Sequence, residues 1–266
     1  MSIEHSNISD TLASAVNDCL TEALLTRHTT SVPKTLFVLG SLAGRIDFIA
    51  ESIFPLDEGQ HIYSQRILSR SLIDHFLKHQ FIFVEWAKSK DDTCASAYLS
   101  YYLWNEELQL SSAYQRQGKL FGGATNAARI DVVRHFHPEA ANISEDDIRN
   151  HAARFSYKRI IDSLSADIYK TGYTSLDAFL PKILPIYSDL SSIVHGGAFA
   201  DLIMASLADD NKREAACKAE SDLALSISAS AKMFTLIFLS NVNGKYLESL
   251  IGYRKLLKQF DLPGGA

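Results

Sequence analysis

Apolar residues recur three and four residues apart through almost the whole chain of 266 residues, which is the spacing of one face of an α-helix. Strict alternation of apolar and polar residues over the length of a strand is hard to find. The hydrophobic fraction of 47% is enough to bury a substantial core. The sequence therefore predicts an all-α fold, and more specifically a single-domain helical bundle.

Prolines and glycines set the expected limits of the helices. Pro33 suits the first turn of a helix that ends near Phe54, just before Pro55, and Pro185 also suits a first helical turn. The expected helices cover residues 6–28, 33–54, 62–88, 92–117, 126–136, 144–168 and 175–195, followed by several pieces of 198–260.

No repeat of fixed period and no low-complexity linker divides the chain. We therefore expect an N-terminal helix in residues 1–34, one helical domain in residues 35–260 and a short tail in residues 261–266. The stretch GKLFGGATN, residues 118–126, breaks the helical pattern and is expected to form a surface loop.

The net charge of −5 argues against a protein that coats nucleic acid along an open basic face. Such binding needs many Lys and Arg contacts to phosphates, although a confined basic cleft remains compatible with this charge. The cysteines Cys19, Cys94 and Cys217 lie far apart and show no CxxC spacing, so neither a disulfide framework nor a cysteine zinc site is indicated. We expect a cytoplasmic protein with no cofactor.

Residues 223–242 form the one stretch that resembles a membrane span in length and composition. Lys232 lies in the middle of this stretch, together with several serines. A buried core helix is therefore the better interpretation, and we expect no contact with a membrane.

The helix expected at residues 62–86 carries a polar strip. At about 100° per residue, its polar members fall within an arc of about 80°; they are Tyr63, Arg66, Arg70 and Asp74. Apolar residues cover much of the opposite side and continue the same arc further along. A helix that is apolar on two sides lies centrally, so this strip should point inward or into a cleft.

Two interpretations of this strip stay open. Arg70 and Asp74 are spaced to form an internal ion pair, or one arginine is left to bind a phosphate. His75 and His79 are spaced to share a metal, but no dense cluster of ligands accompanies them, and we expect no metal requirement.

The segment YSDLSSIVHGG, residues 187–197, ends a helix. Gly196 and Gly197 supply the left-handed residue that commonly closes a helix, so the helix should end near His195. Ser188, Ser191, Ser192 and His195 share one face. A serine hydrolase is disfavoured because a regular helix lacks the strained turn that presents a nucleophile. His195 itself is a candidate for proton transfer.

The pairing of RSLIDHFLKHQFIF, residues 70–83, with YSDLSSIVHGG resembles an uncharacterised bacterial family of helical proteins related to the HEPN superfamily. HEPN proteins are helical bundles, often dimeric, and many are metal-independent ribonucleases in toxin–antitoxin, CRISPR-associated or antiphage systems. Their signature is an arginine followed after four to six residues by a histidine. Arg70 with His75, and Arg129 with His135, fit that spacing and are alternative catalytic pairs.

The resemblance implies an RNA-cleaving effector of defence or stress response, with RNA as substrate, an antitoxin or other protein as partner, and a homodimeric state. We prefer a composite site in which His195 is the general base and Arg70 stabilises the phosphoryl oxygens. Ser191 or Ser192 would orient the phosphate, and Asp74 would hold Arg70, with Arg66 and Tyr63 nearby. The competing hypothesis is a non-catalytic helical module that binds a protein partner or a nucleotide.

Overall fold

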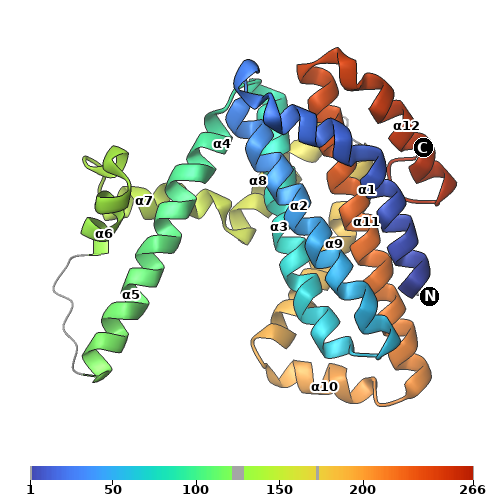
Figure 1. Cartoon of the computed structure of the whole chain (residues 1–266). Coiled ribbons are helices and arrows are strands. Elements are labelled where there is room, and N and C mark those ends of the chain that lie inside the picture. Colours follow the sequence, from blue (N-terminus) through green and yellow to red (C-terminus); the bar gives the residue numbers. More distant parts are fainter. Residues whose placement is uncertain (1, 122–128, 172–173, 266) are drawn as a thin grey trace.

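The computed structural model describes residues 2–121, 129–171 and 174–265. Side-chain environments are described for residues 4–120, 130–166, 181–198 and 200–265. Every regular element in these ranges is helical, with no strand among them. The predicted all-α class is therefore confirmed (Figure 1).

Five long helices form the main bundle, in which α2, α3 and α11 pack against one another and α1 and α12 cover α11 (Figure 1). They are α1 (Ser2–Leu25), α2 (Pro33–Glu58), α3 (Ile62–Ser89), α11 (Asp210–Val242) and α12 (Leu247–Gln259). Against α3 lie α8 and α9, and α10 links α9 to α11; the bounds are α8 (Tyr157–Thr171), α9 (Thr174–Val194) and α10 (Ala198–Ser206).

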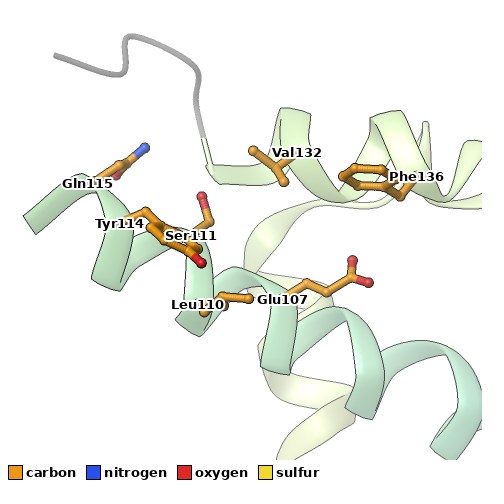
Figure 2. Close-up of a pocket in the computed structure, with 7 residues that line it drawn as sticks. All are labelled: Glu107, Leu110, Ser111, Tyr114, Gln115, Val132 and Phe136. Carbon is orange, nitrogen blue, oxygen red and sulfur yellow. The ribbon is translucent and has the colours of Figure 1, made fainter. Parts of the chain in front are cut away.

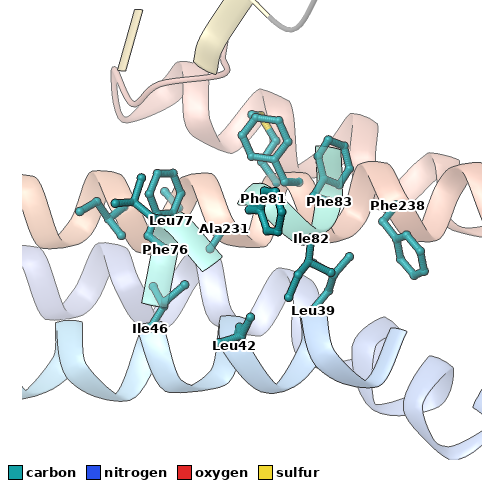
Figure 3. Close-up of a cluster of buried hydrophobic side chains, with 14 of the residues drawn as sticks. Leu39, Leu42, Ile46, Phe76, Leu77, Phe81, Ile82, Phe83, Ala231 and Phe238 are labelled. Atoms are coloured by element: carbon teal, nitrogen blue, oxygen red, sulfur yellow. The ribbon is translucent and has the colours of Figure 1, made fainter. Parts of the chain in front are cut away.

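The centre of the bundle is the contact of α3 with α2 and α11 (Figure 3). The Phe83 ring lies 5.0 Å from the ring of Phe234, and the Trp86 ring lies 4.6 Å from that of Phe238. Leu39 and Leu42 of α2 complete this layer and are fully or almost fully buried. Most of the residues from 72 to 84 on α3 are buried, so the prediction that this helix is central is confirmed.

Among the described residues, one helix, α11, is long and apolar enough to cross a membrane by length and composition alone. Within the fold, 78% of its apolar window is buried, as expected of a core helix. Lys232 in this window pairs with Asp47 of α2 and donates a hydrogen bond to the Ser228 hydroxyl at 2.8 Å. The charge is thus neutralised inside the bundle.

An arm of helices projects from the bundle (Figure 1). It begins with α4 (Thr93–Ala97) and a π-helical turn (Tyr98–Tyr102), and continues with α5 (Leu103–Phe121), α6 (Arg129–Phe136), a short 3-10 turn (Pro138–Ala140) and α7 (Glu145–Ala152). The arm has a small hydrophobic cluster of its own, separate from the main core, made of Trp104, Leu108, Val133, Ala140 and Ile148.

Several expected helix limits were wrong. Pro55 lies inside α2, and Pro185 lies inside α9 rather than in its first turn, because a proline removes one backbone donor without always ending a helix. The helix expected at 144–168 is two helices, since Ser156 adopts an extended conformation (φ −73°, ψ 149°) between them. Residues 118–121 of the expected loop belong to α5, and 122–126 lie outside the described residues.

Candidate functional site

Three charged side chains follow one another along α3 at intervals of four residues. The Asp74 carboxylate lies 2.7 Å from the Lys78 ammonium and 3.7 Å from the Arg70 guanidinium. The expected ion pair of Arg70 with Asp74 is present, but Lys78 holds the carboxylate more closely. Lys78 was not among the predicted site residues, yet it is the main partner of Asp74.

The Lys78 ammonium is mostly buried and has two hydrogen-bond partners. It donates a second hydrogen bond to the Tyr102 hydroxyl at 2.9 Å, in the π-helical turn that opens the arm. Burial alone would lower the pKa of Lys78, but the Asp74 carboxylate and the Tyr102 hydroxyl raise it overall. Lys78 is therefore charged at neutral pH and ties the arm to the bundle.

Arg70 belongs to an aromatic stack that joins three helices. Its guanidinium carbon lies 3.6 Å from the centre of the Tyr187 ring on α9, and Tyr187 is stacked on Tyr157 of α8 with a centroid distance of 3.6 Å and an interplanar angle of 2°. Burial, partly offset by Arg70, raises the pKa of Tyr187 to about 12. Both tyrosines are therefore neutral, and the contact of Arg70 with Tyr187 is a cation–π interaction.

The remaining members of the predicted strip point to different surroundings. Arg66 lies 3.4 Å from Glu220 of α11, where burial raises the pKa of the carboxyl group despite the nearby arginine. Tyr63 is 47% exposed. The strip is therefore two separate ion-pair sites and one surface tyrosine.

His195 directly follows the last residue of α9 and is exposed. Its backbone N–H donates to the Ser191 carbonyl at 3.1 Å, the Gly197 N–H donates to the Ser192 carbonyl, and Gly196 has a φ of +64°. The predicted glycine-capped helix end is confirmed. Ser191 and Ser192 are half-buried beside it.

The preferred composite site is not assembled in the described contacts. Tyr187 lies against Arg70, and His195 comes eight residues later, just past the end of α9, which is about 12 Å along the axis. In the described part of the chain, no hydrogen bond or ion pair joins Arg70 to His195.

The two histidines of α3 have different environments. His75 Nδ1 lies 2.8 Å from the Ser71 carbonyl, one turn earlier. His79 is completely buried, its Nε2 lies 3.0 Å from the Thr235 hydroxyl, and burial lowers its pKa to about 3. The Thr235 hydroxyl donates its one hydrogen to the Ala231 carbonyl, so its oxygen can only accept from His79. The neutral His79 ring therefore donates from Nε2.

No group of three or more metal-ligating side chains gathers among the described residues. The histidines of the two alternative catalytic pairs have other neighbours. His75 is held by its own helix through Ser71, and His135 is exposed on the arm, where its ring contacts Phe136 with a centroid distance of 5.0 Å. The side chain of Arg129 lies outside the described ones.

The arm carries an open, mainly apolar groove with a volume of about 570 Å³. Leu110 and Tyr114 of α5 form one wall, and Val132 and Phe136 of α6 form the other (Figure 2). Large parts of these apolar side chains are open to solvent: Leu110 is 56%, Tyr114 60% and Phe136 67% exposed. Sequence reasoning missed this groove.

One carboxylate stands at the edge of this groove. Glu107 Oε1 lies 2.9 Å from His137 Nε2, whereas Glu107 Oε2 is buried and has no hydrogen-bond partner. A buried acceptor without a donor is unfavourable by about 1–3 kcal/mol.

A smaller pocket of about 290 Å³ lies between the N-terminal helix and the chain end. His5 Nε2 and Lys218 Nζ each lie 2.7 Å from one oxygen of Asp222. His5 and Asp222 are 217 residues apart, so no local pattern in the sequence predicts this contact.

The chain matches no family model, no curated protein and no solved structure in three comparisons with known proteins. The charged cluster around Arg70 is largely satisfied within the protein, whereas the groove on the arm presents exposed apolar surface.

Proposed function

We propose that the protein is a non-catalytic helical module that binds a partner protein through the groove between α5 and α6. The observation that carries this proposal is the open apolar groove itself, whose walls are exposed on an arm that projects from the bundle. Contiguous exposed apolar surface of this kind marks an interaction site in soluble proteins.

The shape and chemistry of the groove specify the occupant. Two helices with apolar walls accept the apolar face of a third helix, with anchors three, four and seven residues apart. The occupant is therefore the apolar face of an amphipathic helix.

Binding is favoured over chemistry in this groove. Glu107 is the one carboxylate among the residues that line it, and its Oε1 is already held by His137. The rest of the lining is mainly apolar, without the paired acid and base that catalysis of proton transfer requires.

Site-specific photo-crosslinking in cells tests this function. A photoreactive phenylalanine analogue replaces Leu110 in the groove, and, as a matched control, Leu202, which is 68% exposed on α10. We expect a defined protein adduct at position 110 and none at position 202. The adduct should disappear when Phe136→Glu places a charge on the facing wall.

Equal labelling at both positions, or an adduct at position 110 that survives Phe136→Glu, would contradict the proposal. Phe136 is largely exposed, so its replacement should leave the fold intact, and an unchanged circular dichroism spectrum and melting temperature check that.

RNA binding is a second candidate, favoured by the incomplete pairing of Arg70. The guanidinium has five N–H donors, yet its distance to Asp74 is 3.7 Å because Lys78 occupies that carboxylate. The side chain of Arg70 is also 22% exposed. The resemblance to HEPN ribonucleases gives this candidate its chemistry, with Arg70 on the phosphate and His195 as base.

Total RNA from cells that overproduce the protein, compared with cells that overproduce Arg70→Ala or His195→Ala, tests this second candidate. Fragments with a 2′,3′-cyclic phosphate that vanish in both variants would support cleavage. Intact RNA with the parent protein would count against it.

A further inference from the structure

The pocket between the beginning of α1 and the segment that follows α12 has an apolar floor. Leu225 of α11 is 5% exposed there. Ile8, Phe260 and Leu262 are half-buried around it and pack against the main core. Three parts of the chain that lie far apart in the sequence therefore enclose one space of about 290 Å³.

The wall that follows α12 is held in one conformation. The Leu262 N–H donates to the Leu257 carbonyl at 2.8 Å, and Asp261 has a left-handed φ of +54°. A Cβ atom added at Gly264 would clash with Met233 Sδ, so this segment packs closely against α11. The pocket is therefore preformed, as small-molecule sites usually are.

The two basic side chains of the lining are already paired within the protein. Lys218 Nζ and His5 Nε2 each lie 2.7 Å from a different oxygen of Asp222. The His5 ring is also 6% exposed and is stacked on Phe54, with a centroid distance of 5.8 Å. Both basic groups are therefore committed to Asp222.

Two further carboxylates of the lining stand apart from these contacts. Glu4 of α1 and Asp261 after α12 are exposed, and no described side chain forms an ion pair with either of them. The charge that remains without a partner in this pocket is therefore negative, and it lies above an apolar floor.

We infer that this pocket binds a small organic ammonium ion. Glu4 and Asp261 hold its charged group, and Leu225 and Phe260 contact its apolar body. The volume is about ten times the ~30 Å³ that one water molecule takes in the liquid, so the ligand has on the order of ten non-hydrogen atoms. This site is separate from the groove on the arm and does not depend on the function proposed for that groove.

The ligand joins the beginning of α1 to the segment after α12, because it contacts both. Such contacts exist only in the folded protein, so binding stabilises the fold and raises the melting temperature as the ligand concentration rises. For a ligand of this size we expect a Kd on the order of 0.1–1 mM.

A chemical-shift titration of the ¹⁵N-labelled full chain with three probes of the same shape tests the inference. The probes are phenethylamine, its neutral analogue 2-phenylethanol and the anion phenylacetate. Phenethylamine should shift the amides of residues 218–226 and 260–262. The alcohol should bind at the same place about tenfold more weakly, since it lacks the charge, and phenylacetate should not bind.

Glu4→Gln combined with Asp261→Asn should weaken phenethylamine by about tenfold and leave the affinity for 2-phenylethanol unchanged. Asparagine adopts a left-handed φ readily, so this change at position 261 keeps the backbone. Asp18→Asn combined with Glu248→Gln is the matched control, because it removes two exposed carboxylates outside the pocket. This control should bind phenethylamine like the parent.

A third variant tests the location. Ser226→Leu fills part of the pocket and should abolish binding of both the amine and the alcohol, with an unchanged circular dichroism spectrum as the check on folding. The inference is overturned if phenethylamine does not bind at 10 mM or if phenylacetate binds equally well. It is also overturned if the affinity for phenethylamine is the same in the pocket variants as in the parent.

Discussion

Lys78 donates a hydrogen bond to Asp74 across one turn of α3, with 2.7 Å between Nζ and Oδ2. This contact changes what the neighbouring arginine does. Arg70 keeps only a longer contact to the same carboxylate and instead lies against the ring of Tyr187. Lys78 is therefore the closely held cation beside Asp74, and Arg70 is the more replaceable of the two.

Substitutions should show that Lys78 contributes more to the free energy of unfolding than Arg70 does. Arg70→Ala removes a cation–π contact worth about 0.5–2 kcal/mol and leaves Asp74 paired, so the free energy of unfolding should fall by about 1–2 kcal/mol. Lys78→Met removes the close partner of Asp74 and the donor to Tyr102, and should lower it by about 3 kcal/mol. Urea unfolding of both variants checks the order, and a larger loss in Arg70→Ala would refute it.

The buried His79 should make stability depend on pH. Its pKa is lowered from 6.5 to about 3 by burial, so below pH 6.5 the unfolded chain binds a proton that the folded protein does not bind until about pH 3. Stability should therefore fall as the pH falls, by about 2 kcal/mol between pH 7 and pH 5 through this residue.

His79→Leu tests that dependence against a matched variant of an exposed histidine, His28→Ala. Denaturant unfolding at pH 7 and pH 5 gives the loss for each protein. The loss should be smaller in His79→Leu than in the parent and unchanged in His28→Ala. The same loss in all three proteins would show that His79 does not cause it.

In the ion pair of Lys232 with Asp47, which joins α11 to α2, removing Asp47 should cost more stability than removing Lys232. The Lys232 side chain is 5% exposed and that of Asp47 is 19% exposed, so Asp47→Leu leaves the more buried charge and should cost about 3–5 kcal/mol. Lys232→Met leaves Asp47 with water and the Ser228 hydroxyl and should cost less. The double variant should recover most of the loss, and a double-mutant cycle by thermal unfolding measures this coupling.

The small cluster of the arm should be a separate unit of local stability. Trp104 contacts only the arm cluster in its core packing, so Trp104→Ala should speed hydrogen exchange of α5, α6 and α7 by more than tenfold and leave α3 and α11 protected. Phe83→Ala in the main core is the reverse control, because it should speed exchange in the bundle helices rather than in the arm. Uniform loss of protection in Trp104→Ala would mean that the arm and the bundle unfold together.

Local sequence pattern was sufficient to predict the helices whose ends carry strong sequence signals. The helix expected at 62–88 is α3 (Ile62–Ser89), and the end near His195 follows from Gly196. Proline was a weaker signal, since Pro55 and Pro185 lie within helices whose other backbone hydrogen bonds and packing compensate for the missing donor.

The candidate sites were less predictable, because they depend on contacts between helices. Periodicity places Arg70 beside Asp74. It does not predict the hydrogen bond from Lys78 to Tyr102 or the packing of Tyr187, from α9, against Arg70. The groove exists only where α5 and α6 meet, and its apolar residues have the same spacing in the sequence as residues that fill a core.

The most direct measurement of the central claim is the yield of photo-crosslinked protein as the reactive residue is moved along α5. The yield should be high at positions 103, 110 and 114 and low at 105, 109 and 112, because a helix seated in the groove contacts one side of α5. Such a helical period would establish the groove as a protein-binding site. A yield that does not vary with the face of α5, or that is highest at 105, 109 and 112, would contradict the account.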